Sequence, residues 1–442
     1  MTTQWYATDP LPTGSRVAVP ALVEGLTRAM DDIAFPMDPA SLRPVVLSQQ
    51  SYGELFTAAS ALLRLLRRTL LESAPASAGR IAALGADEHL YPLFIDGEVE
   101  EAFATCIARP DVMVDATGPK FVEFNIGAGI GGVVDTALNS AAWTAAYGGP
   151  ELAPFTGPDP LAVRDEIFVR AVRELGVAPA VAIVGTARDL NGSRTTRYYD
   201  VQVDSLRNRG MKAEFFEPED LLEGLGLPGR PRYEVGLRHF TIPEWRGHGI
   251  DLAPVRTALD AGCTLISTQT AYLISNKKVL GWVSEGRPWM TEQDRDIVDR
   301  YLPWTRVVSD RATRWQGSSY VLPELLLDRP EEFVLKPAVG MKAQDVLVGR
   351  DCDAELWRRT VTRAAAHEDH IVQQYVVPVA CPMEFADADG DTYEADVLPV
   401  FSPYVFDGKP GGCMVRYLPP GGHGVVSIHG HGALPSVALA RR

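Results

Sequence analysis

The stretch FVEFNIGAGIGG, Phe121–Gly132, decides the fold, because its residues fit two binding sites that exclude each other. Three glycines spell G-x-G-x-x-G, the outline of a dinucleotide-binding turn: Gly127, Gly129 and Gly132. Directly before them, Glu123 and Asn125 alternate along a predicted strand, so both side-chain oxygens lie on one face of it. The stretch therefore predicts either a pyrophosphate site or a metal site.

The chain after the glycines argues against a dinucleotide-binding turn. A dinucleotide-binding turn leads through a helix to a second strand that ends in an acidic residue about 20 residues further on. The segment SAAWTAAYGGPEL, residues 140–152, offers no such strand before Glu151. The stretch therefore does not fit a dinucleotide-binding turn, and we expect its glycines to let a substrate or phosphate approach the backbone closely.

The composition predicts a globular protein of two or three domains, because the chain has 442 residues of which 46% are hydrophobic. The net charge of -15 argues against a nucleic-acid partner, which would need a basic face. We find no apolar run of about 18 residues and no secretory signal in MTTQWYATDP, so we expect no membrane partner and a cytoplasmic location. The five cysteines lack C-x-x-C spacing, which predicts buried thiols and not zinc ligands or disulfides.

The local patterns alternate between helix and strand. Apolar spacings of three and four predict a helix over residues 51–74, and residues 180–265 read as a small α/β unit whose last helix ends at CTLIST. Residues 331–376 follow the order strand, glycine turn, strand, helix, strand. The segment from residue 380 onward is rich in glycine, proline and short strands.

Lysines are scarce, and two groups of them interrupt apolar segments. Lys336 ends the strand EEFVLKP, where burial of its ammonium is costly unless an anion meets it. The turn at Gly340 could offer backbone N–H groups to a phosphate, although Lys336 could also be an edge residue that reaches water. In SNKK, either Lys277 or Lys278 could point at the same phosphates, while the other faces solvent.

Oxygen-bearing side chains are predicted on two neighbouring strands joined by a turn at residues 117–119. Asp111 lies on the first strand, and Glu123 and Asn125 lie on the second. Such oxygen ligands suit magnesium, which completes its shell with water and nucleotide phosphates. The alternative is structural: Asp111 or Asp115 serves the turn, and Glu123 pairs with an arginine.

Further segments carry weaker signals. The strand HIVQQYVVPV, residues 370–379, could present its backbone to an adenine edge, and Arg416 could clamp a carboxylate. The histidines of the glycine-rich tail are interpreted as polar surface, since zinc needs a tighter set of ligands: His423, His429 and His431.

In combination these segments resemble the ATP-grasp superfamily, in which two β-rich lobes hold ATP and two lysines bind its phosphates. The resemblance rests on five short motifs: Arg109-Pro110-Asp111, Glu123-Phe124-Asn125, S-N-K at 275–277, K-P at 336–337 and Q-Q-Y at 373–375. The superfamily usually places its E-x-N strand after both lysines, whereas here that strand precedes them. The chain therefore resembles the circularly permuted branch typified by glutathionylspermidine synthetase.

The resemblance implies a mixed α+β chain with a circularly permuted ATP-grasp fold and a pre-ATP-grasp α/β domain. Residues 1–160 would hold an N-terminal helical part and the permuted metal-binding strands, and residues 161–270 the pre-ATP-grasp substrate domain. The helical part of the ATP-binding core would span 271–330. The lid lobe would span 331–376, and the rest of the core 377–442.

The resemblance also implies residue roles. The magnesium ligands would be Asp111, Glu123 and Asn125. ATP would be held by Lys277, Lys336, the lid turn at Gly340, and the adenine-contacting residues Gln373, Gln374, Tyr375 and Val376. The catalytic residues would be Arg109, Lys336 and Arg416, with ATP and two Mg²⁺ ions as cofactors. Met341–Gln344 departs from the family, whose lid has a glycine-rich R-E-G character.

The activity implied is that of an ATP-dependent carboxylate–amine ligase, which forms an amide through an acyl phosphate and releases ADP and phosphate. Its substrates would be an amino acid or peptide carboxylate and an amine, and the arginine-rich composition indicates bacterial specialised metabolism. The alternatives are transfer to a carrier-protein thiol, a non-catalytic nucleotide-binding protein and, more distantly, a dehydrogenase. A carrier protein and a second copy of the chain are the macromolecular partners considered.

Overall fold

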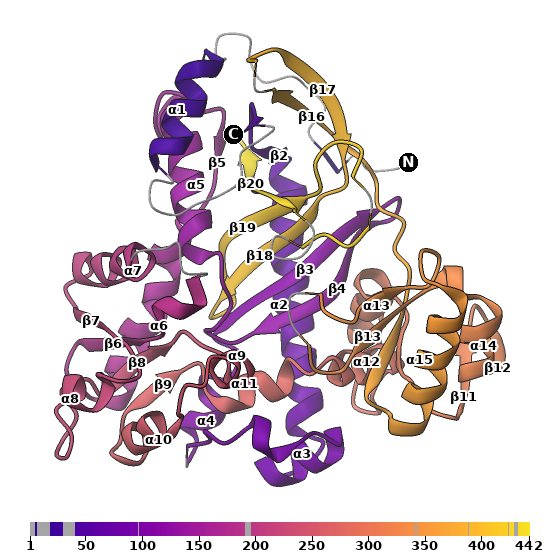
Figure 1. The fold of residues 1–442 in the computed structure, drawn as a ribbon, viewed down its shortest axis with the longest axis horizontal. Coiled ribbons are helices and arrows are strands. Elements are labelled where there is room, and N and C mark those ends of the chain that lie inside the picture. Colours follow the sequence, from indigo (N-terminus) through magenta and orange to yellow (C-terminus); the bar gives the residue numbers. More distant parts are fainter. Residues whose placement is uncertain are drawn as a thin grey trace.

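The computed structural model has several sheets with helices packed around them (Figure 1). It describes residues 5–6, 18–29, 40–95, 97–190, 196–340, 343–387, 389–422, 424–427 and 432–442. The predicted mixed α/β class is confirmed. Two predictions fall outside the described residues, because they concern Met341 and Lys342 of the lid turn and the histidines of the tail.

The largest sheet has seven strands in the order β2-β20-β19-β18-β3-β4, with β5 beside β20. Its strands are β2 (Val45–Leu47), β20 (Leu434–Arg441), β19 (Lys409–Tyr417), β18 (Val400–Phe406), β3 (Ile107–Asp115), β4 (Gly118–Ile126) and β5 (Phe155–Thr156). Strands β2 and β20 run parallel to each other, and the other neighbouring pairs in the sheet are antiparallel. The sheet therefore joins the N-terminal hairpin β3–β4 to the C-terminal strands.

The long helix α2 covers one face of this sheet. It spans Gln49–Leu71, close to the predicted residues 51–74. It begins where the side chain of Ser48 accepts a hydrogen bond from the backbone N–H of Ser51. Its apolar residues share one buried cluster with alternate residues of the sheet, such as Val112 and Phe401. Because side chains alternate along a strand, Asp111 and Ser402 lie on the opposite face of the sheet.

A second sheet is parallel, with the order β7-β6-β8-β9. Its strands are β6 (Ala180–Val184), β7 (Lys212–Phe216), β8 (Val235–Arg238) and β9 (Thr264–Ile266). The predicted α/β unit is present, but the expectation that its last helix ends at CTLIST is wrong. That helix, α10 (Ala253–Asp260), ends earlier, and the apolar residues after it form the edge strand β9 beside β8.

A third sheet is antiparallel and carries the predicted hairpin, in the order β10-β15-β13-β14. Its strands are β10 (Thr305–Val307), β15 (His370–Gln374), β13 (Phe333–Pro337) and β14 (Leu347–Val348). Helices α14 (Leu322–Asp328) and α15 (Ala354–His367) share a buried cluster with Phe333 and Leu335. Lys336 therefore points away from these helices, and Figure 1 shows this lobe beside the hairpin β3–β4.

The other elements connect or cover these sheets. The smaller strands are β1 (Ala40–Ser41), β16 (Cys381–Ala386), β17 (Thr392–Val397), β11 (Ala312–Trp315) and β12 (Ser318–Val321). The helices are α1 (Val19–Ala29), α3 (Ser77–Leu84), α4 (Val99–Ala102), α5 (Val133–Ala146), α6 (Pro160–Leu175), α7 (Arg197–Asn208), α8 (Leu221–Leu225), α9 (Ile242–Gly247), α11 (Gln269–Ile274), α12 (Lys277–Glu285) and α13 (Glu292–Tyr301). Short 3-10 turns lie at Glu88–Leu90, Ala187–Leu190 and Pro330–Glu332. None of the helices in the described ranges is both long and apolar enough to cross a membrane.

Candidate active site

The hairpin β3–β4 brings the predicted oxygen ligands together. In its register Asp111 lies opposite Glu123, and Arg109 lies opposite Asn125. The amide nitrogen Nδ2 of Asn125 donates to the carbonyl oxygen of Arg109 at 3.2 Å, which leaves the amide oxygen as its acceptor end. The pairing of the two strands thus gathers three oxygen-bearing side chains and one guanidinium.

The S-N-K motif begins α12 against strand β4, and each of its three residues has a separate contact. Ser275 donates its hydroxyl to the carbonyl oxygen of Phe124 at 3.0 Å. Asn276 caps the helix by accepting a hydrogen bond from the backbone N–H of Lys278 at 3.0 Å. Lys277 then extends its ammonium to Glu123, with 3.1 Å between Nζ and Oε1.

Lys277 also holds the turn that follows Lys336. Its Nζ donates to the carbonyl oxygen of Gly340 at 3.2 Å, and its backbone N–H donates to that of Ala338 at 2.9 Å. The beginning of α12 is therefore fastened both to β4 and to the hairpin β13–β14.

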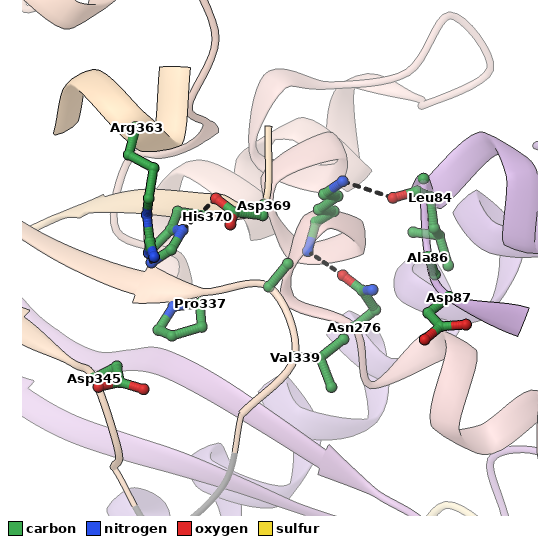
Figure 2. Close-up of a pocket in the computed structure, with 13 residues that line it drawn as sticks. Leu84, Ala86, Asp87, Asn276, Pro337, Val339, Asp345, Arg363, Asp369 and His370 are labelled. Carbon is green, nitrogen blue, oxygen red and sulfur yellow. Dashed lines mark hydrogen bonds and ion pairs between the residues drawn. The ribbon is translucent and has the colours of Figure 1, made fainter. Parts of the chain in front are cut away.

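Lys278 points elsewhere, and the expectation that the second lysine faces solvent is wrong, because its side chain is buried. Its Nζ donates to the carbonyl oxygen of Leu84 at 2.6 Å, at the end of α3. It lines a separate cavity of about 300 Å³ with Asn276, Asp369 and His370, which Figure 2 shows. Neither Lys277 nor Lys336 lines that cavity. Of the two neighbouring lysines, Lys277 is the one that contacts a predicted metal ligand, Glu123.

Lys336 reaches the same place from the antiparallel sheet. Its Nζ donates to the carbonyl oxygen of Val122 at 2.9 Å and to Oε1 of Gln373 at 2.8 Å. Gln373 in turn donates to the hydroxyl of Thr305 at 3.0 Å. The ammonium is thus oriented by two strands of its own sheet and by one strand of the large sheet.

Burial lowers the pKa of Lys336 to about 8, because a low-dielectric surrounding disfavours the ammonium. Glu123 and Asp111 raise this pKa, and the positive charge of Lys277 lowers it further. The two carboxylates and two ammonium groups are therefore electrostatic neighbours, although they come from three distant segments of the chain.

Asp111 is neutralised within the large sheet. Its Oδ1 accepts hydrogen bonds from Arg416 at 2.7 Å and from the hydroxyl of Ser402 at 2.8 Å. Burial opposes its charge, but Arg416 and Arg109 outweigh burial and hold the pKa of Asp111 below its usual value. Arg109 donates to the carbonyl oxygen of Gly131 at 2.9 Å.

The structural alternatives for these carboxylates are only partly realised. Asp115, and not Asp111, serves the turn, because its Oδ1 accepts from the backbone N–H of Thr117 at 2.6 Å. Glu123 does have a cationic partner, but this partner is Lys277 and not an arginine.

The glycines of the opening stretch pack against protein. A Cβ at Gly129 would lie 2.8 Å from the carbonyl oxygen of Phe240, and one at Gly132 would lie 2.7 Å from the hydroxyl oxygen of Tyr404. At Gly127 it would meet the ring of Tyr272 at 3.0 Å. The expectation that these glycines make room for a substrate or phosphate is therefore wrong, since protein atoms take up that space.

The predicted adenine-contacting residues lie at the end of β15. The side chain of Gln373 is buried and turned toward Lys336. The backbone N–H groups of Gln374 and Tyr375 donate to Trp304 and Glu332 at 2.8 Å and 2.7 Å. A contact of these residues to an adenine edge stays a prediction.

The predicted metal ligands alone do not make a closed site. Among the residues the structure describes, no three His, Cys, Asp or Glu side chains lie close enough together to hold a metal ion. Asp111 and Glu123 supply two carboxylates and Asn125 an amide, a hard oxygen set that fits magnesium if phosphate oxygens complete the shell. The two lysines beside them fit those phosphates.

Ser402 and Gln373 were not predicted as partners of charged groups, and Ser275 was not predicted to anchor α12 to β4. Every residue of the apolar run VFSPYVF, Ser402 included, is buried, so no alternation in this strand could have placed Ser402 on one face of the sheet. The pairing of Ser402 with Asp111 could not have been found in this way, because it joins distant strands.

The comparisons with known proteins concern the fold. No protein-family model matches the sequence, and the comparison with curated proteins gave no match. Among solved structures, a glutathione synthetase-like effector from Globodera pallida in its apo form covers 98% of this chain and 100% of its own, with a TM-score of 0.58 and 14% identity. This chain has the fold of that protein.

Two further synthetases align less closely. A D-cycloserine synthetase has a TM-score of 0.28 and 20% identity, over 49% of this chain and 74% of its own. A gamma-glutamylcysteine synthetase-like protein from Methylobacillus flagellatus has a TM-score of 0.39 and 12% identity, over 85% of this chain and 87% of its own.

Proposed function

We propose that this chain is an ATP-dependent carboxylate–amine ligase with a circularly permuted ATP-grasp fold and the domain boundaries given above. The observation that carries the proposal is the convergence of Lys277 and Lys336 on Glu123, between the large sheet and the antiparallel sheet. Two ammonium groups beside a carboxylate set suit a triphosphate with its metal ion. The fold shared with a glutathione synthetase-like protein is consistent with this assignment.

In this proposal the lysines hold the phosphates. The ammonium of Lys336 is oriented by Gln373 and by the carbonyl oxygen of Val122. The carbonyl oxygen of Gly340, in the turn, accepts a hydrogen bond from Lys277. Groups held in place before the reaction need little reorganisation as charge develops, which is the main source of electrostatic catalysis. Such positioning is what phosphoryl transfer requires of a protein.

Asp111, Glu123 and Asn125 would hold Mg²⁺, which would neutralise charge on the phosphates when it is bound. We assign two ions to the site, following the resemblance of these strands to the family. Arg109 and Arg416, on the same face of the sheet, are suited to the carboxylate substrate and to charge on the transferred phosphoryl group.

The proposed reaction joins the γ-phosphoryl group of ATP to a substrate carboxylate, and an amine then displaces phosphate from this acyl phosphate. The substrates would be an amino acid or peptide carboxylate and an amine, in the cytoplasm of a bacterium with specialised metabolism. A carrier-protein thiol as acceptor and a homodimer stay predictions that the product and the oligomeric state would test.

The test is ADP release measured over a panel of amino acids paired with amines, with the product identified by mass. We expect ADP release that depends on both substrates and a product equal in mass to their sum less water. Lys336→Met and Lys277→Met should lower the rate by about 10² or more, because each removes a cation from the phosphates. Lys278→Met is the matched control, since the ammonium of Lys278 points to Leu84, and it should keep most of the rate.

The outcomes separate the alternatives. A product found only on an added carrier-protein thiol would replace the amine acceptor, and nucleotide binding without substrate-dependent ADP release would indicate a non-catalytic protein. Equal losses in Lys277→Met and Lys278→Met, with both variants folded, would contradict the phosphate role of Lys277.

A further inference from the structure

Lys277 and Glu123 form an ion pair, so each side chain hinders the other from binding a phosphate or a cation. The ammonium lies 3.1 Å from the carboxylate oxygen Oε1, and the two side chains are 8% and 27% exposed. A second hydrogen bond, at 3.2 Å, ties the same ammonium to the carbonyl oxygen of Gly340. A phosphate that binds Lys277 must compete with these oxygens, and a cation that binds Glu123 must compete with the ammonium.

The charges around this pair increase the competition. Glu123 would face an incoming phosphate as a like charge, and Lys277 and Lys336 would face an incoming cation in the same way. Asp111, the other carboxylate, is held by Arg416 and Ser402. Buried or half-buried charges are screened much less than exposed ones, so either ligand alone meets an unfavourable charge.

We infer that the Lys277–Glu123 ion pair is a latch that makes the site select a metal–nucleotide complex over free nucleotide or free metal ion. This inference rests on the proposed function. A phosphate that draws Lys277 away frees Glu123 for the cation, and a cation that takes Glu123 frees Lys277 for the phosphate. Because binding free energies are linked, each ligand must strengthen the other by the same factor.

The latch leads to an unusual expectation for Glu123→Gln. Removing a proposed metal ligand should tighten the binding of ATP in the presence of EDTA, because Lys277 is released and the like charge is gone. The same variant should bind ATP with Mg²⁺ more weakly than the wild type. We expect changes of about tenfold in opposite directions, equivalent to about 1.4 kcal/mol each.

The reciprocal variant tests the other half of the pair. Lys277→Met frees Glu123, so the nucleotide-free protein should bind Mn²⁺, used as the probe cation, about tenfold more tightly than the wild type. The measurements are isothermal titration calorimetry for ATP with and without Mg²⁺, and electron paramagnetic resonance for free Mn²⁺.

The matched control is Asp115→Asn, on the same hairpin. It changes the net charge by the same amount, and the amide oxygen can still accept from the backbone N–H of Thr117. It should leave metal-free ATP binding unchanged. Circular dichroism melting checks that all three variants are folded.

The outcomes distinguish the latch from the proposed function. If Glu123→Gln binds ATP no better than the wild type in EDTA, while wild-type protein binds ATP with Mg²⁺, the latch is wrong and the proposed function is not affected. An equal tightening in Asp115→Asn would also overturn the latch, because general charge would explain it. Absence of nucleotide binding to the wild type under both conditions would overturn the proposed function itself.

Discussion

At Lys336, burial and charge conflict directly. Its side chain is 8% exposed, yet its ammonium contacts only a carbonyl oxygen and an amide oxygen among the hydrogen bonds described. Burial therefore lowers its pKa to about 8, whereas an unperturbed lysine titrates near 10.4. The folded protein releases this proton before the unfolded chain does, so the cost of the buried charge falls as the pH rises through about 8.

The lowered pKa predicts the pH dependence of nucleotide binding. Phosphates bind the protonated form, so affinity for ATP should be constant from about pH 7, where the terminal phosphate is ionised, to about pH 8 and fall by up to about tenfold per pH unit above it. Calorimetry in buffers of different ionisation enthalpy should detect proton uptake on binding above pH 8. Lys336→Arg keeps its charge beyond pH 12 and should bind ATP with little pH dependence. A wild-type affinity that stays constant to about pH 10 would contradict the lowered pKa.

At the scale of elements, the loop between β4 and α5 joins the site to the parallel sheet. The carbonyl oxygen of Gly131 accepts from Arg109 and from the hydroxyl of Tyr404, at 2.9 Å and 2.8 Å. Gly129 packs against the carbonyl oxygen of Phe240, just after β8. The loop therefore positions Arg109 through the hydrogen bond to Gly131. The close packing of Gly129 holds the loop against the parallel sheet.

Two neighbouring glycines test this packing role. Gly129→Ala should lower the free energy of unfolding by about 1–3 kcal/mol, because its Cβ would overlap backbone atoms. Gly131→Ala is the control, since no atom lies within 4 Å of its Cβ among the described residues, and it should change stability by less than about 0.5 kcal/mol. Chemical denaturation of both variants measures the difference. Equal stability of the two would show that the contact with Phe240 can relax.

For the whole molecule, the candidate site lies where the large sheet meets the antiparallel lobe. From the antiparallel sheet, the ammonium of Lys336 donates to the carbonyl oxygen of Val122 in the large sheet. The backbone N–H of Lys277 donates to the carbonyl oxygen of Ala338, just after β13. Figure 1 shows the lobe with β13 and α15 beside β4, the edge strand of the large sheet. A ligand bound there would contact both parts and favour the assembled state over the unfolded one.

The position of the site predicts a nucleotide-specific gain in stability. ATP with Mg²⁺ at a hundredfold excess over its Kd should stabilise the protein by about 2.7 kcal/mol and raise its melting temperature. NAD should give no rise, because the glycines of G-x-G-x-x-G are filled by protein atoms. Differential scanning calorimetry compares the two ligands, and Lys336→Met should lose most of the rise. A larger effect of NAD than of ATP would favour a dinucleotide site.

Local sequence patterns determined several elements and some of the site. Apolar spacing predicted α2, and alternation predicted the hairpin β3–β4 with Glu123 and Asn125 on one face. A pattern of period two or 3.6 is a property of consecutive residues, so the sequence suffices for it. Thr264–Ile266 was predicted as the end of a helix but forms strand β9. A short apolar run does not by itself distinguish a strand from a helix.

Only the tertiary structure decided which of these residues meet. The order of strands in the large sheet places Asp111 beside Ser402 and Arg416, and the docking of α12 on β4 brings Lys277, and not Lys278, to Glu123. The tertiary structure also places protein atoms where a Cβ of Gly127, Gly129 or Gly132 would lie. The physical reason is that these contacts join residues far apart along the chain, so they depend on strand register and on packing between sheets, which no local period encodes.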